Sequence, residues 1–229
     1  MENKIGELKI PKDEVLRYLG YRSQQIDEEL DKLINLTIEE CKFLIAPKFI
    51  TSKFKVELVD GGVKLLGTNI LLSGNDIKGH LKYSKECVLM GVTIGGIIEK
   101  RINLYSKTNL TKSLILDSCA TTAVEEICDR IEEYIKNEVL KKGESITFRY
   151  SPGYGDLSLD VQKDIINTLN AEKTIGLTVS AHNLLMPRKS VTAIIGLIPR
   201  DKEVRKKSCE VCKNYESCSF RKEGIVCGS

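Results

Sequence analysis

A long amphipathic helix predicted near the middle of the chain limits the fold more than any other sequence feature. Between residues 114 and 140, apolar side chains recur at three- and four-residue steps, and acidic side chains lie mostly off that stripe. Such spacing predicts a helix that is buried along one face. Gly143 is placed to end it. The apolar stripe consists of Leu116, Cys119, Ala123, Val124, Ile127, Ile131, Tyr134 and Ile135.

Alternating apolar patterns before and after this helix predict β-strands. Residues 54 to 65 alternate around an Asp-Gly turn, which predicts a β-hairpin. The run from 87 to 93 is apolar enough for a buried strand, and residues 190 to 198 predict another. Residues 146 to 150 also alternate, so we expect a strand that carries Arg149 on the face opposite its apolar side.

The order of these elements indicates the fold class. Residues 1–50 form a helical region by the same spacing criterion, and Pro47 ends its main helix. Helices and hairpins are mixed without a regular βαβ rhythm, which favours an α+β fold over a doubly wound parallel sheet. We therefore predict helices packed on a mainly antiparallel twisted sheet in one domain over residues 1–199, followed by a linker and a small cysteine-rich tail over 200–229.

The composition excludes several classes of protein. Hydrophobic residues make up 41% and charged residues 29%, with 35 Lys+Arg against 32 Asp+Glu, as in a soluble globular protein. Acidic and basic residues are interleaved, whereas a nucleic-acid binder concentrates positive charge in a patch. The chain has neither a signal-peptide pattern nor a long apolar run. We expect a cytoplasmic protein with no nucleic-acid or membrane partner.

The eight cysteines fall into two groups. One group forms a Cys-x2-Cys-x5-Cys-x8-Cys array near the C-terminus, consisting of Cys209, Cys212, Cys218 and Cys227. Four thiolates at such spacing can enclose zinc or hold an iron-sulfur cluster, and the spacing does not decide between them. The other group is scattered over apolar faces and is expected in the core; it consists of Cys41, Cys87, Cys119 and Cys128.

A polar turn follows the strand predicted over residues 146 to 150. Its sequence is Arg149-Tyr-Ser-Pro-Gly-Tyr-Gly. An arginine beside a glycine-containing turn places a planar two-pronged donor next to open backbone groups, and Tyr154 adds a flat apolar surface with a polar tip. The motif predicts a pocket for a small zwitterion with a ring system. We assign no catalytic residue, since His80 and His182 fit neither a triad nor a metal spacing.

The same motif resembles a known family signature. Together with Gln162-Lys163, Thr174-Ile-Gly-Leu-Thr and Met186-Pro-Arg-Lys-Ser-Val, it is similar to the S-adenosylmethionine-binding reactivation domain of cobalamin-dependent methionine synthase. The upstream helix from Asp117 to Asn137 extends the similarity. The chain departs from the family at residues 155–158, where the family has a turn that contains proline and cysteine.

The resemblance implies roles for five residues. Arg149 would hold the carboxylate end of S-adenosylmethionine, and Ser151 and Gly153 would contact the nucleoside through their backbone. Tyr154 would lie toward the corrin. Glu125 would line the same cleft.

The resemblance also implies an accessory function, in which a stand-alone reactivation domain acts on cobalamin carried by a partner. One electron from a low-potential donor such as flavodoxin or ferredoxin, and a methyl group from S-adenosylmethionine, would restore an oxidised cob(II)alamin. The chain would hold the methyl donor in line with cobalt and supply no acid or base. The expected partner is a corrinoid methyltransferase, first of all a methionine synthase that lacks its own activation domain.

Two alternative functions remain open at this point. One is a binding module in which the four-cysteine tail recognises a protein or nucleic acid and the rest is a scaffold. The other is an accessory activator of a different corrinoid methyl-transfer pathway, which shares the same chemistry with another cobalamin carrier.

Overall fold

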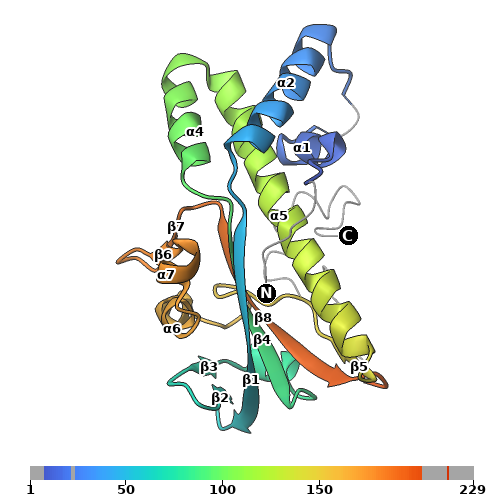
Figure 1. Cartoon of the computed structure of the whole chain (residues 1–229), viewed down its shortest axis with the longest axis vertical. Coiled ribbons are helices and arrows are strands. Elements are labelled where there is room, and N and C mark those ends of the chain that lie inside the picture. Colours follow the sequence, from blue (N-terminus) through green and yellow to red (C-terminus); the bar gives the residue numbers. More distant parts are fainter. Residues whose placement is uncertain (1–7, 22–23, 203–215, 217–229) are drawn as a thin grey trace.

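The computed structural model describes residues 8–21, 24–202 and 216, which form an α+β fold (Figure 1). Its main sheet has six antiparallel strands in the order β3-β2-β1-β4-β8-β5. These strands are β1 (Lys48–Val59), β2 (Gly62–Leu65), β3 (Leu71–Ser73), β4 (Glu86–Thr93), β5 (Glu144–Ile146) and β8 (Ser190–Pro199). A separate hairpin pairs β6 (Thr178–Val179) with β7 (Leu185–Met186). The predicted fold class and antiparallel sheet are confirmed.

Helices cover both faces of the sheet. One face carries α1 (Lys12–Tyr18), α2 (Glu28–Leu44), α4 (Ile97–Thr108) and α5 (Leu110–Leu140). The other carries α3 (Asn75–His80), the 3-10 helix η1 (Leu159–Val161), α6 (Gln162–Thr168) and α7 (Ala171–Ile175). Two hydrophobic cores result. We call the one that contains residues of α5 the α5 core and the one that contains residues of α6 the α6 core.

Strand β4 separates the two cores. Val88 and Met90 belong to the α5 core, whereas Cys87 and Leu89 belong to the α6 core. Successive side chains of a strand point to opposite faces, so a strand covered by helices on both sides needs apolar residues at every position. The continuous apolar run over residues 87 to 93 is explained by this burial of β4 on both faces.

Helix α5 extends along the length of the molecule (Figure 1). It spans 31 residues, or about 45 Å. It begins at Leu110, four residues before the predicted start, because the Asn109 side chain accepts a hydrogen bond from the Lys112 N–H at 3.0 Å. Gly143 has φ +74° just beyond its end.

The segment before the polar turn differs from the expected strand. Strand β5 ends at Ile146, and its pairing with β8 continues through a hydrogen bond from the Thr147 N–H to the Gly196 C=O at 2.9 Å and an isolated bridge between Tyr150 and Ile194. The chain advances four residues from Ile146 to Tyr150, while β8 advances three from Leu197 to Ile194. The extra residue is that of a β-bulge.

The bulge changes which face each side chain occupies. Ile146 packs against the α5 core, but Phe148 and Tyr150 pack in the α6 core. Arg149 lies between the latter two in sequence and contacts α5. Sequence periodicity placed Ile146, Phe148 and Tyr150 on one face, and that prediction is wrong for Ile146.

The four scattered cysteines are buried as expected. Desolvation raises the pKa of Cys87 and of Cys119 to about 12, so these thiols stay protonated near neutral pH. The four-cysteine array of the tail lies outside the described residues. Of the helices in the described ranges, none combines the length and apolar character needed to cross a membrane.

The carboxylate of Asp156, from the turn region, caps the N-terminus of helix α3. The Asp156 side chain accepts hydrogen bonds from the N–H of Asn75 at 2.6 Å and of Asp76 at 3.2 Å. Gly74 precedes these residues with φ +139°, and a Cβ there would lie 2.3 Å from the Asp156 carboxylate. Asp156 belongs to the segment that departs from the family signature, and here it ties the turn to α3.

Replacing Asp156 by alanine is therefore expected to destabilise the fold. The loss of a charged cap should lower the free energy of unfolding by about 1–2 kcal/mol. Chemical denaturation measures this change, with Asp164→Ala on the exposed side of α6 as the control, for which a change within about 0.5 kcal/mol is expected. Equal stabilities of the two variants would contradict the capping role.

Candidate functional site

A cleft opens beside the polar turn, at the edge of β8. Its volume of about 350 Å³ lies within the range of small-molecule sites. Helix α5, the turn, η1 with the start of α6, the β6–β7 hairpin and the start of β8 all contribute to its walls. The lining residues are Glu125, Ser151, Pro152, Leu159, Gln162, Asn183, Leu184, Leu185, Arg188, Ser190, Val191 and Thr192.

The free edge of β8 gives the cleft a main-chain donor and acceptor. Ile194 exchanges both main-chain hydrogen bonds with Tyr150, at 2.8 and 3.0 Å. Residues two apart in an antiparallel strand direct their main-chain groups to the same side, so Thr192 directs its N–H and C=O to the cleft side. Its hydroxyl donates to the buried Gln162 Oε1 at 2.9 Å, which fixes this part of the strand.

The cleft walls combine apolar surface with a few polar groups. The apolar part comes from Pro152, Leu159, Leu184, Leu185 and Val191. Among the polar lining residues, Asn183 donates through Nδ2 to Asp160 at 2.8 Å and lies at the turn of the β6–β7 hairpin. This composition is typical of sites that bind a mostly flat or apolar molecule and orient it by a few polar contacts.

Arg149 lies beside the cleft and is bound to α5. Its Nη2 contacts Asp129 at 2.5 Å and Glu125 at 3.3 Å, and its Nε contacts Glu132 at 3.0 Å. Positions 125, 129 and 132 share one face of a helix. The side chain is only 12% exposed and is not part of the cleft lining.

The electrostatic setting of Arg149 favours its charged form. Burial lowers the pKa of Arg149, but the neighbouring Cys128 and the three carboxylates outweigh that effect and hold the pKa above its ordinary value. Burial in turn raises the pKa of Cys128 to about 12. Arg149 therefore joins the bulged segment to α5 and holds Glu125, which lines the cleft.

The other predicted site residues lie in and next to the cleft. Glu125 and Ser151 line it. Gly153 has φ +87°, and a Cβ there would come within 3.1 Å of the Leu159 side chain. Tyr154 is 38% exposed and sets its ring edge-on to Tyr150, with centroids 5.2 Å apart. The structure thus brings all five predicted residues to one region, with Arg149, Gly153 and Tyr154 outside the lining.

Sequence analysis missed several polar groups of the cleft. Arg188 is one of two consecutive cations that follow Pro187, and the sequence pattern alone does not assign it to the cleft. The structure separates them: Lys189 contacts Asp117 at 2.9 Å and Thr121 at 2.8 Å on α5, whereas Arg188 is exposed and lines the cleft. The Glu99 carboxylate accepts the main-chain N–H groups of both residues.

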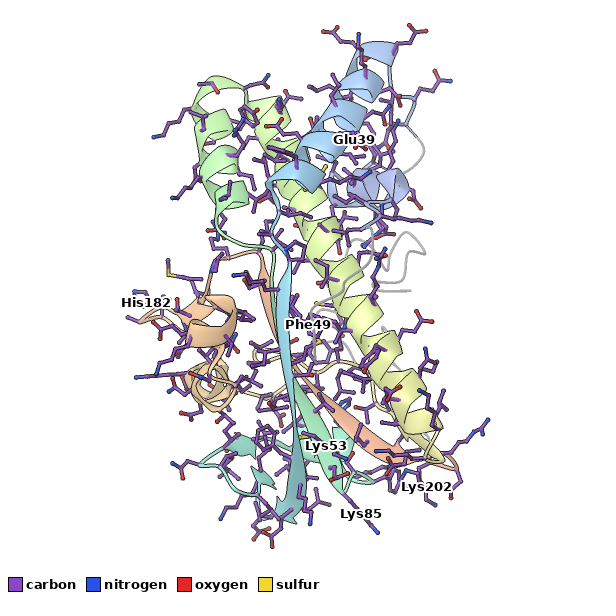
Figure 2. The ribbon with its side chains drawn as sticks, in the orientation of Figure 1. Glu39, Phe49, Lys53, Lys85, His182 and Lys202 are labelled. Atoms are coloured by element: carbon purple, nitrogen blue, oxygen red, sulfur yellow. The ribbon has the colours of Figure 1, made fainter. Side chains whose placement is uncertain are left out.

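Neither histidine belongs to the cleft. His80 is buried, with Nε2 at 2.8 Å from the Thr147 hydroxyl and its ring 4.4 Å from that of Phe148. His182 is exposed and lies on the β6–β7 hairpin, away from the body of the sheet (Figure 2). In the described part of the chain, no cluster of three or more His, Cys, Asp or Glu side chains is arranged to hold a metal ion. The predicted ligands Cys209, Cys212, Cys218 and Cys227 lie outside that part.

Comparison with solved structures gives a likeness that bears on the fold. No protein-family model matches the chain, and no curated protein matches it. A solved structure described as the crystal structure of the MetH reactivation domain bound to AdoHcy is similar, with a TM-score of 0.59 and 14% sequence identity. The similarity covers 87% of this chain and 73% of that chain. At this level of identity the likeness shows a shared fold.

Replacing Arg149 by alanine is expected to destabilise the protein. The change leaves three carboxylates close together without their shared cation and should lower the free energy of unfolding by about 2 kcal/mol, less than for a fully buried pair because the acids are partly exposed. Arg130→Ala is the control: Arg130 pairs with Glu126 at 2.8 Å near the surface of the same helix. Its loss should cost below about 1 kcal/mol, and a larger effect of Arg130→Ala in denaturation would refute the clamping role of Arg149.

Proposed function

We propose that this chain binds S-adenosylmethionine in the cleft at the edge of β8 and supports the reactivation of a cobalamin-dependent methyltransferase, first of all a methionine synthase. The observation that carries the proposal is the position of the cleft. It lies beside the turn whose sequence resembles the family signature, in a fold similar to that of a domain solved with AdoHcy. AdoHcy is the product that S-adenosylmethionine becomes after it gives up its methyl group.

The chemistry of the cleft fits this ligand. S-adenosylmethionine combines a flat base, a ribose, a sulfonium and a zwitterionic amino-acid end. The main-chain N–H and C=O of Thr192 suit the edge of a base, and the apolar walls suit its faces. The ribose hydroxyls have Ser151 and Asn183 as partners. Glu125 and Arg188 provide one charge of each sign for the amino-acid end.

The chain's own residues act in this proposal by binding and orientation. When bound, S-adenosylmethionine supplies the methyl group that goes to the cobalt of a partner's corrinoid, which has first taken up one electron. The turn and the edge of β8 hold the nucleoside at a fixed place, and holding the two reactants together lowers the barrier by proximity. The apolar walls exclude water from the ligand. The transfer needs no acid or base, and the cleft carboxylate of Glu125 is already paired with Arg149.

Exposed apolar residues around the cleft support a protein partner there. Tyr154, Leu159, Leu184 and Met186 are all exposed large side chains, and Leu159 and Leu184 line the cleft itself. Exposed apolar surface next to a ligand site is typical of a docking face. We propose that the corrinoid-carrying partner covers this side, with Tyr154 toward the corrin. A flavodoxin or ferredoxin as electron donor belongs to the same proposal.

The cysteine tail adds a separate proposal. A zinc ion or an iron-sulfur cluster held by Cys209, Cys212, Cys218 and Cys227 stays a prediction from their spacing. Elemental analysis of the purified protein should find about one zinc or a few irons per chain in these cases, and neither in a Cys209→Ser/Cys212→Ser variant. Absence of both metals from wild-type protein purified anaerobically would contradict the proposed metal site.

Calorimetric titration tests the binding of S-adenosylmethionine. We expect saturable binding of S-adenosylmethionine and of AdoHcy to the wild-type chain. Ser151→Phe places a ring in the cleft and should weaken the binding of both ligands by about 5- to 150-fold, since steric overlap costs about 1–3 kcal/mol. Ser106→Phe, on the exposed side of α4, is the matched control and should bind as the wild type does.

A reactivation assay tests the second half of the proposal. The wild-type chain, added to a methionine synthase without its activation domain, should restore activity after oxidation when a reductant and S-adenosylmethionine are present. Ser151→Phe should restore little. No binding of either ligand to folded wild-type protein would refute the proposed function, and binding without reactivation would direct the search to a different corrinoid methyltransferase.

A further inference from the structure

We infer that Arg188 receives the carboxylate of the bound amino-acid end and that Glu125 receives its ammonium group, while Arg149 acts as a positioning residue for Glu125. This inference rests on the proposed function and assigns the polar contacts within the same cleft. It differs from the role that the family resemblance implies for Arg149.

The contacts of Arg149 argue against a direct role in carboxylate binding. Its Nε and Nη2 are already engaged by carboxylates of α5, and its Nη1, which has no hydrogen-bond partner among the described residues, is enclosed and out of reach of a ligand in the cleft. Three acidic groups surround one guanidinium, so an additional anion would meet net negative charge at that place. Binding there would also require Arg149 to leave contacts that join the bulged segment to α5.

Arg188 differs from Arg149 in its exposure, in its position relative to the cleft and in the ion pairing of its guanidinium. It lines the cleft and is exposed, and within residues 8–21 and 24–202 its guanidinium has no ion-pair partner. Its main-chain N–H is held by the Glu99 carboxylate, so the base of the side chain has a fixed position. An exposed guanidinium on an anchored backbone can take a carboxylate through a two-pronged contact without breaking an existing pair.

Glu125 provides the complementary charge. Its carboxylate lines the cleft, its side chain is 43% exposed, and its contact with Arg149 at 3.3 Å is the longest of the three ion pairs. A ligand ammonium can therefore share this carboxylate with Arg149. A cation and an anion in one cleft favour a zwitterion over ligands that carry a single charge or none.

Three related ligands test the binding of the carboxylate and of the ammonium group separately. S-adenosylmethionine has both groups, decarboxylated S-adenosylmethionine lacks only the carboxylate, and 5′-methylthioadenosine lacks the whole amino-acid end. Arg188→Ala should weaken the binding of S-adenosylmethionine by about 10- to 100-fold, because only this ligand has the carboxylate that Arg188 binds. The affinities of the other two ligands should stay within about twofold of the wild-type values. Arg188→Lys should fall between, since it keeps the charge but loses the planar fork.

Arg149→Ala should give a different pattern. Loss of its hold on Glu125 should weaken the binding of both amino-bearing ligands by the same factor, and by more than the binding of 5′-methylthioadenosine, whose affinity measures any movement of the turn itself. Arg200→Ala is the matched control, because Arg200 is an exposed arginine just beyond the far end of β8; all three affinities should stay at the wild-type values.

Calorimetry on the full chain, with folding checked by circular dichroism, distinguishes the outcomes. A selective loss of S-adenosylmethionine affinity in Arg188→Ala supports the assignment. Wild-type affinity in Arg188→Ala, together with a selective loss of S-adenosylmethionine affinity in folded Arg149→Ala, overturns it and leaves the proposed function intact. Failure of the wild type to bind any of the three ligands overturns both.

Discussion

The ion pairs between Arg149 and α5 fix the geometry on which the rest of the site depends. They join a segment that has left regular strand pairing to the longest helix of the molecule. The Tyr150–Ile194 bridge holds the same segment to β8, and the Asp156 carboxylate holds its other end to α3. Three different elements therefore position one short turn, and the cleft lies where that turn departs from the sheet edge.

The sequence was sufficient for the parts of the fold in which local pattern and burial agree. The stripe of α5 and the alternation around Gly61 each predicted an element of the correct type, because a single face of each is buried. The continuous run of β4 predicted a strand buried on both faces. The segment from Ile146 to Tyr150 was not predictable in this way, since its bulge depends on pairing with β8, which lies more than 40 residues further along the chain.

The candidate site shows the same division. The turn from Arg149 to Tyr154 was found from its residue types, and the structure places it beside a cleft. The contacts that decide the role of each charged side chain could not be predicted from the sequence. Arg149 and Arg188 are both arginines near glycine or proline. Among the described residues, three carboxylates pair with the guanidinium of Arg149, whereas the carboxylate nearest to Arg188, that of Glu99, binds its main-chain N–H. Only this difference in space separates a structural cation from an available one.

The bulge before Tyr150 sets which face of the sheet each following side chain reaches. One inserted residue reverses the parity of every side chain that follows it, so Arg149 is on the α5 side and Tyr150 on the opposite side. If the residues after Ile146 alternated regularly without the bulge, Arg149 would lie in the apolar α6 core and Tyr150 would face the three acids. The single extra residue thus matches the charge of Arg149 to α5 and the ring of Tyr150 to the α6 core.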